Sequence, residues 1–245
     1  MKAHGVSRRS FINRLAVALP LACIGRAAAA AQAPKETGLS SEGLLAGHAG
    51  FQARSVAPLG YSALPGFLSA PQLAAHHAQY AEAVESLKQV EQTLATGERT
   101  TGTSLADYAA LRRKHVALGN DVLLHELYFG NLSATTVAVP PYVRRHMDEH
   151  MGSLERWADD FRLCALAAQA WAVLVYDPYD DRWHNVVMDG NAEGVWIGAN
   201  PLVVCDVAPP AYSPEYADRE AYVGTFLDHI DWAEVAARYR RVDRM

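Results

Sequence analysis

Two long segments with helical spacing of apolar residues dominate the middle of the chain. Apolar side chains recur at steps of three, four or seven residues over 69–96 and again from Ser104 to Leu132. This spacing places them on one face of an α-helix. A short turn with two glycines, Gly97 and Gly102, separates the segments. We therefore expect an antiparallel pair of helices that bury their apolar faces against each other.

The pattern changes after Pro140-Pro141. Residues 142–169 are expected to form two helices that divide near Gly152-Ser153. Short runs rich in Val, Leu and Trp follow and predict three antiparallel strands, at 171–176, 183–188 and 201–206. Helical spacing then returns at 216–230 and 232–239. The predicted fold class is α+β: a two-helix antiparallel hairpin followed by an α/β domain with a three-stranded antiparallel sheet and flanking helices.

The first 31 residues have the features of an export signal. Ser7-Arg8-Arg9-Ser10-Phe11-Ile12 is a twin-arginine pattern, and an apolar run over 15–25 follows it. This run is too short to span a bilayer, and the alanines at 27–31 suit a signal peptidase. We predict a signal peptide over 1–31, handled by the twin-arginine export machinery, and a periplasmic or secreted product.

The rest of the chain is divided by the same patterns. Residues 32–66 are rich in Gly, Ser, Ala and Pro without periodicity and predict an extended arm. The helical hairpin domain is then expected over 67–138 and the α/β domain over 139–245.

Three cysteines bear on the location of the protein. Cys23 raises a lipid anchor as an alternative, but Pro20 stands where a lipoprotein signal carries an aliphatic residue, so a soluble product is favoured. Cys164 and Cys205 remain after cleavage, and their spacing matches no zinc motif. The predicted compartment permits a disulfide between them.

Charge argues against nucleic acid as a partner. Five of the 22 basic residues and none of the 27 acidic residues lie in the predicted signal. The remaining chain therefore carries a formal charge of −10, which does not suit binding to phosphate backbones.

Three side chains are candidate metal ligands. His76 and His125 lie within the apolar stripes of the two expected helices, and Asp206 ends an apolar strand. Imidazole is a common ligand of transition metals, and a buried carboxylate needs a cation or several donors. A single histidine on an apolar face is more often a core residue with one satisfied hydrogen bond. The three residues together indicate a metal site.

Six motifs follow one another over about residues 66–241. They are Ser69-Ala70-Pro71-Gln72-Leu73 before His76-His77, His125-Glu126-Leu127-Tyr128-Phe129, Gly152-Ser153-Leu154-Glu155-Arg156-Trp157, Trp171-Ala172-Val173-Leu174-Val175, Asp206-Val207 with Ala211-Tyr212, and Asp231-Trp232-Ala233-Glu234-Val235. The order of these motifs resembles that of the iron/manganese superoxide dismutase family. The resemblance implies one iron or manganese ion held by His76, His125 and Asp206 between the helical hairpin and the α/β domain, and disproportionation of superoxide to oxygen and hydrogen peroxide.

The chain departs from the family next to Asp206. The family carries a further ligand histidine four residues after this aspartate, where the present chain has Pro210, which has no lone pair for a metal. The family's tryptophan beside the site corresponds to Ala208, and its glutamate that bridges to a partner subunit corresponds to Pro209. A homodimer is therefore left open. Two hypotheses follow. The protein is either an active dismutase, with a substitute ligand or solvent in the empty position, or a non-catalytic binding or interaction protein of this fold.

Other family positions have also changed. The gateway tyrosine aligns best with Ala83, although Tyr80 lies one turn from His76. The outer-sphere glutamine corresponds to Asp121 in the iron type, and to Gly190 or Asn191 in the manganese type. The candidate substitute ligands or neighbours of the metal are His184, which we rank first, His77, Tyr80, Tyr212 and Cys205.

Two further motifs have simpler interpretations. His146-Met147-Asp148-Glu149-His150 matches the inverted zinc-protease pattern, but a solvated charged helix face is the better interpretation. Asp177-Pro178-Tyr179-Asp180-Asp181 has enough acidic residues for calcium but lacks EF-hand spacing, so we expect a hairpin turn.

Overall fold

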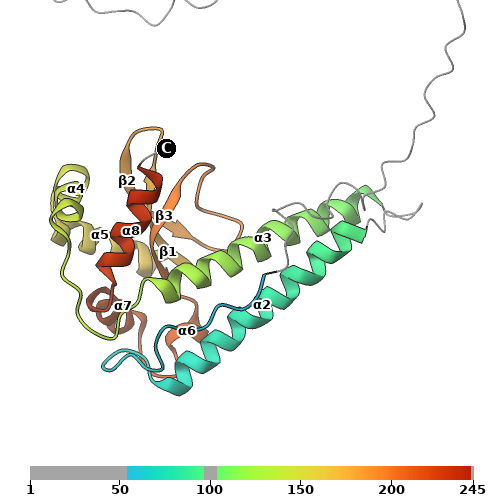
Figure 1. Cartoon of the computed structure of the whole chain (residues 1–245), viewed down its shortest axis with the longest axis horizontal. Coiled ribbons are helices and arrows are strands. Elements are labelled where there is room, and N and C mark those ends of the chain that lie inside the picture. The colour runs from blue at the N-terminus through green and yellow to red at the C-terminus, as the bar shows by residue number, and fades with distance from the viewer. Residues whose placement is uncertain (1–53, 97–103, 244–245) are drawn as a thin grey trace, which may run out of the picture. The chain divides into compact units, whose positions relative to one another are not determined.

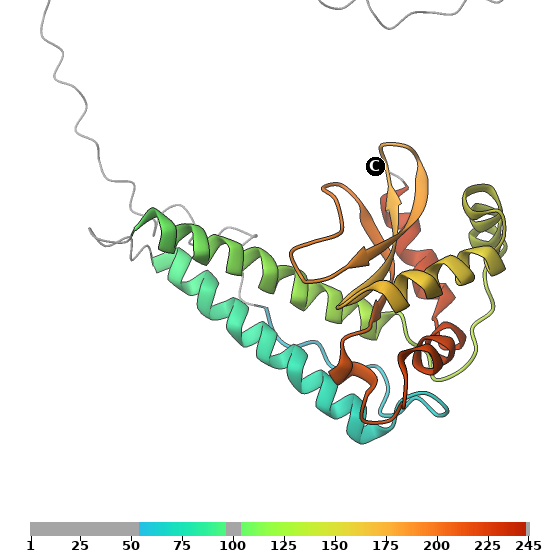
Figure 2. The ribbon, with the colours of Figure 1, turned by 180° about the vertical axis from the view of Figure 1, so that it is seen from behind.

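Two long helices lie side by side in the N-terminal part of the described chain. The computed structural model describes residues 54–96 and 104–243. Helix α2 spans Ala70–Thr96 and helix α3 spans Leu105–Gly130, and they run antiparallel (Figures 1 and 2). The side chain of Ser104 caps α3 by accepting a hydrogen bond from Asp107 N, which satisfies one of the free amides of the first turn. The predicted helical hairpin is confirmed.

The segment after the hairpin forms two helices, as predicted. Helix α4 spans Pro141–Met151 and α5 spans Leu154–Ala167. Gly152 divides them with a φ of 88°, a backbone conformation that glycine adopts without steric cost. Ser153 then caps α5 through a hydrogen bond from Arg156 N.

A three-stranded antiparallel sheet follows, again as predicted. The strands are β1 (Trp171–Asp177), β2 (Arg182–Met188) and β3 (Asn200–Asp206), in the order β2-β1-β3. Every residue of the central strand β1 is buried. Trp171 pairs with Met188 on one side and with Asp206 on the other. The last residue of β3 is thereby placed beside the first residue of β1.

The C-terminal part contains three helices, of which the first was not predicted. Helix α6 is a single turn over Pro209–Tyr212, followed by α7 (Arg219–Asp228) and α8 (Trp232–Val242). Two prolines begin α6, where their missing amides cost no helical hydrogen bond. The expected helix start at residue 216 was wrong, because Asp218 accepts a hydrogen bond from Ala221 N and caps α7 there.

Buried polar contacts connect the end of α3 to the sheet. Asn131 Oδ1 accepts a hydrogen bond of 2.7 Å from Val204 N in β3. The Arg238 guanidinium in α8 donates to the carbonyl oxygens of Leu127 (2.8 Å) and Leu202 (3.1 Å). These bonds satisfy buried backbone groups and fix the positions of α3, β3 and α8 relative to one another.

The start of helix α2 is hydrogen-bonded to α6, the short helix that follows β3. Gln72 Nε2 donates to the carbonyl oxygens of Pro210 and Ala211, both at 2.9 Å. Ser69 binds the carboxylate of Glu215 through both its amide and its hydroxyl. The start of α2 is therefore held close to the chain that leaves β3.

Among the described residues, no helix has the length and apolar character needed to cross a membrane. The predicted signal peptide, Cys23 and most of the predicted arm lie outside the described residues.

Candidate metal centre

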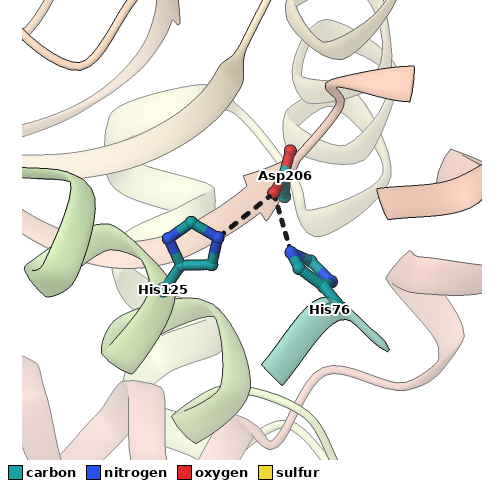
Figure 3. Close-up of side chains that lie close together, drawn as sticks. All are labelled: His76, His125 and Asp206. Carbon is teal, nitrogen blue, oxygen red and sulfur yellow. Dashed lines mark hydrogen bonds and ion pairs between the residues drawn. The ribbon is translucent and has the colours of Figure 1, made fainter. Parts of the chain in front are cut away.

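Three buried side chains converge where the two long helices meet the sheet (Figure 3). His76 comes from α2, His125 from α3 and Asp206 from the end of β3. One possible ligand atom of each lies within 4.8 Å of those of the other two. The distance from Asp206 Oδ2 is 2.9 Å to His76 Nε2 and 3.9 Å to His125 Nε2. The three residues singled out from the sequence therefore form one cluster.

The backbone after β3 orients the Asp206 carboxylate. Its Oδ1 atom accepts a hydrogen bond of 2.9 Å from Ala208 N, just after the strand ends. The other oxygen, Oδ2, is the one that faces both histidines. Because one oxygen is held by the backbone, the second is pre-oriented as an acceptor or ligand.

His125 is held through its second ring nitrogen. Its Nδ1 atom donates to the carbonyl oxygen of Asp121 at 2.9 Å and lies 3.1 Å from the Asp121 carboxylate. This contact leaves Nε2 to face Asp206. Burial by itself lowers the pKa of His125, but the hydrogen bonds to Asp121 and the charges of Asp206 and Asp121 raise it above its usual value.

His76 has no such support. It is fully buried, and its Nδ1 atom has no hydrogen-bond partner among the described residues. The rings of Tyr128 and Phe129 lie 5.0 and 5.1 Å from its own, and Trp171 lies 5.0 Å from His125. The cluster is therefore enclosed by aromatic side chains.

The donor set fits a transition-metal ion. Two imidazole nitrogens and one carboxylate oxygen face each other in a buried place, which is a ligand combination typical of iron, manganese and zinc sites. The 2.9 Å contact between His76 and Asp206 is short enough for both atoms to bind one ion, since such ligand atoms lie about 2.0–2.2 Å from a metal. An ion at this point would also replace the proton that otherwise joins these two side chains.

Proline occupies the position four residues after Asp206. Pro210 lies in α6 and is exposed, and its carbonyl oxygen accepts the hydrogen bond from Gln72. Of the histidine, cysteine, aspartate and glutamate side chains that the structure describes, no fourth lies within 4.8 Å of all three members of the cluster.

The structure does not bring His184, the first-ranked substitute, into the cluster. His184 pairs with Val175 near the β1–β2 turn, whereas Asp206 pairs with Trp171 at the opposite end of β1. Four residues along a strand correspond to about 13 Å. His184 Nε2 instead lies 2.9 Å from Asp180 Oδ2, in a separate group that also contains Asp177.

The other suggested neighbours have their own partners. His77 Nε2 donates to the carbonyl oxygen of Ala57 at 2.8 Å. The Tyr80 hydroxyl donates to Glu126 at 3.1 Å and accepts from Ala57 N at 3.0 Å, while the Tyr80 ring lies 6.2 Å from that of His125. Tyr212 stacks on Tyr222 at 5.3 Å.

The two cysteines that lie within the described residues are both free thiols. Cys164 is partly buried in α5, and Cys205 is buried in β3 next to Asp206.

The two other motifs singled out in the sequence, around His146–His150 and Asp177–Asp181, have structural roles. His150 Nδ1 accepts a hydrogen bond of 3.2 Å from Trp183 N, so this histidine caps an amide of β2. Burial, with the charges of His146 and Arg182, lowers its pKa. Asp177–Asp181 forms the turn between β1 and β2, as predicted. Asp121, singled out in the sequence only as the counterpart of the iron type's outer-sphere glutamine, contacts the His125 ring, as the spacing of four residues on one helix could have indicated.

The chain is similar in sequence to proteins of one known family. Residues 140–238 match the model of the iron/manganese superoxide dismutases, C-terminal domain. The chain is 32% identical over 187 residues to superoxide dismutase [Mn] 2 of Haloferax volcanii, which covers 75% of this chain and 93% of the relative. It is 32% identical over 186 residues to superoxide dismutase [Mn] 2 of Halobacterium salinarum, covering 74% and 92%. It is 28% identical over 164 residues to superoxide dismutase [Fe] of Cupriavidus metallidurans, covering 65% and 82%.

Proposed function

Because the chain belongs to the iron/manganese superoxide dismutase family, we propose that it holds one iron or manganese ion on His76, His125 and Asp206 and disproportionates superoxide to oxygen and hydrogen peroxide. The observation that carries the proposal is the convergence of two imidazole nitrogens on one carboxylate oxygen in a buried place. The relatives named above include manganese and iron enzymes, which supports either ion.

The residues of this chain have separable roles in that function. When bound, the ion supplies the change of oxidation state that disproportionation requires. Asp206 and the two histidines bind it, and the hydrogen bond from Ala208 N keeps the carboxylate oriented. The aromatic rings around the histidines limit the access of water. The Tyr80 hydroxyl, which donates to Glu126, holds a proton one helical turn from His76.

Pro210 stands where the family carries a further ligand histidine. Proline has no side-chain donor, so the ion is held by three protein ligands, with solvent or another ligand in the fourth position. A second candidate function is a non-catalytic binding or interaction protein of the same fold. The exposed Pro209 and Pro210, which stand where the family carries a glutamate and a histidine, favour it. Dimerisation is a separate question for both candidates, to be answered by sedimentation of the purified protein.

We further propose that the protein is exported folded to the periplasm. The twin-arginine pattern at 7–12 and the following apolar and alanine segments support this location. Replacing both arginines by lysine, Arg8→Lys with Arg9→Lys, is expected to retain the protein inside the cell. Equal amounts of wild type and variant in the periplasmic fraction would contradict export by this route.

The function is tested by elemental analysis and a superoxide dismutase assay on one preparation. His125→Ala is expected to lose both metal and activity, whereas His184→Ala, outside the cluster, is expected to keep both. Circular dichroism checks that each variant is folded. Stoichiometric metal without activity in the wild type would favour the non-catalytic candidate, and folded wild type without any metal would refute the metal site.

A further inference from the structure

Asp121 makes a double contact with one of the candidate ligands. It lies one helical turn before His125 on α3, and both its carbonyl oxygen and its carboxylate face the Nδ1 atom of that ring, at 2.9 and 3.1 Å. The His125 side chain is 8% exposed and that of Asp121 is 22% exposed. The pair is therefore better shielded than an ordinary surface ion pair, whose contribution is small.

The contact distinguishes His125 from His76. Both histidines direct Nε2 toward Asp206 Oδ2. The Asp121 carboxylate contacts the Nδ1 atom of His125, whereas the Nδ1 atom of His76 has no hydrogen-bond partner in the described part of the chain. A carboxylate behind a ligand imidazole fixes the ring and increases the electron donation of its other nitrogen to a metal.

We propose that Asp121 is a positioning residue of the metal centre, which holds His125 with Nε2 toward the ion and favours the trivalent over the divalent ion. The inference rests on the proposed function, because it assumes that the ion is bound. It goes beyond it by assigning a role to a residue outside the three ligands. At this position the resemblance implies a neutral glutamine, so the negative charge is a property of this chain.

The physical basis is the charge of Asp121 rather than its shape. The backbone carbonyl already accepts the His125 Nδ1–H, so the ring keeps one acceptor without the carboxylate. A negative charge one imidazole away from the ion attracts a trivalent ion more strongly than a divalent one. Removing the charge should therefore weaken binding of both ions, and that of the trivalent ion more.

The test compares Asp121→Asn, which keeps the size and an acceptor oxygen, with Asp159→Asn as control. Asp159 has a side chain that is 77% exposed, and it forms an ion pair with Arg162 on the same helix, α5. The affinity of the apoprotein for Co²⁺ is measured by competition with a chelator. We expect Asp121→Asn to reduce it by about 10-fold to 100-fold, and the control to leave it unchanged.

A second readout separates charge from a general loss of structure. The midpoint potential of the iron-loaded protein is expected to rise in Asp121→Asn, by about 59 mV if the trivalent ion loses ten times more affinity than the divalent ion. Wild-type affinity and potential in the variant would overturn this inference and leave the proposed function intact. Wild-type protein that binds no metal would overturn both, and a drop in affinity with unchanged potential would overturn the preference for the trivalent ion.

Discussion

The Nε2 atom of His76 lies 2.9 Å from the Oδ2 atom of Asp206, although 130 residues separate them in the chain. The contact joins α2 to the end of β3, and both groups are buried. A buried carboxylate is costly unless a cation or donors face it. In this protein His76 and the backbone amide of Ala208 provide those donors. This is also the place where we propose that the metal ion is bound.

Restoring a histidine at position 210 tests whether the proline removes a ligand. Pro210→His is expected to tighten Co²⁺ binding about tenfold or more, about 1.4 kcal/mol, because a fourth ligand, the third imidazole nitrogen, is returned four residues after Asp206. Pro209→His is the matched control, with the same side chain one position away. Chelator competition measures both, and equal affinities in the two variants would show that Pro210 does not stand at the family's ligand position.

The buried guanidinium of Arg238 is expected to stabilise the junction of α3, β3 and α8. Arg238→Ala removes the donors to the carbonyl oxygens of Leu127 and Leu202. We expect it to lower the free energy of unfolding by about 2–4 kcal/mol, since hydrogen bonds to charged groups contribute more than neutral ones. Urea titration is the measurement, with the exposed Arg241→Ala as control. Similar midpoints for the two variants would contradict this role.

Gly194 is required by both its conformation and its surroundings. Its φ is 110°, and a Cβ atom added there would lie 2.6 Å from the carbonyl oxygen of Val187. Gly194→Ala should therefore destabilise the protein by about 1–3 kcal/mol. Gly190→Ala is a matched control in the same loop, because nothing lies within 4 Å of its added Cβ. Thermal unfolding compares the two, and equal losses would sink the prediction.

His150 is expected to make the protein sensitive to acid. Its lowered pKa means that the folded state resists protonation of a ring whose Nδ1 accepts the Trp183 amide hydrogen bond. As the pH falls below the unfolded value of about 6.5, the unfolded chain takes up a proton that the folded chain does not, so stability is lost. Replacing the ring by an uncharged acceptor, His150→Gln, should reduce this loss. The measurement is the difference in melting temperature between pH 7.5 and pH 5.5, which must be smaller in the variant for the prediction to hold.

The sequence by itself determined the elements whose signals are local. The helical periodicity of α2 and α3 and the apolar runs of the strands depend on neighbouring residues, and all were predicted close to their observed bounds. His76, His125 and Asp206 could be named because each occupies a recognisable position in its own element. Local patterning thus identified the candidate ligands one by one.

Only the tertiary structure decided which groups meet. Strand register, not sequence distance, separates His184 from Asp206, because they pair with opposite ends of β1. The same holds for α6, which is held by hydrogen bonds from Gln72 in a distant helix. Such contacts arise from packing of segments far apart in the chain, and no local propensity records them. Local patterns in the sequence therefore singled out the candidate ligands, and the packing of α2, α3 and the sheet brought them to one point.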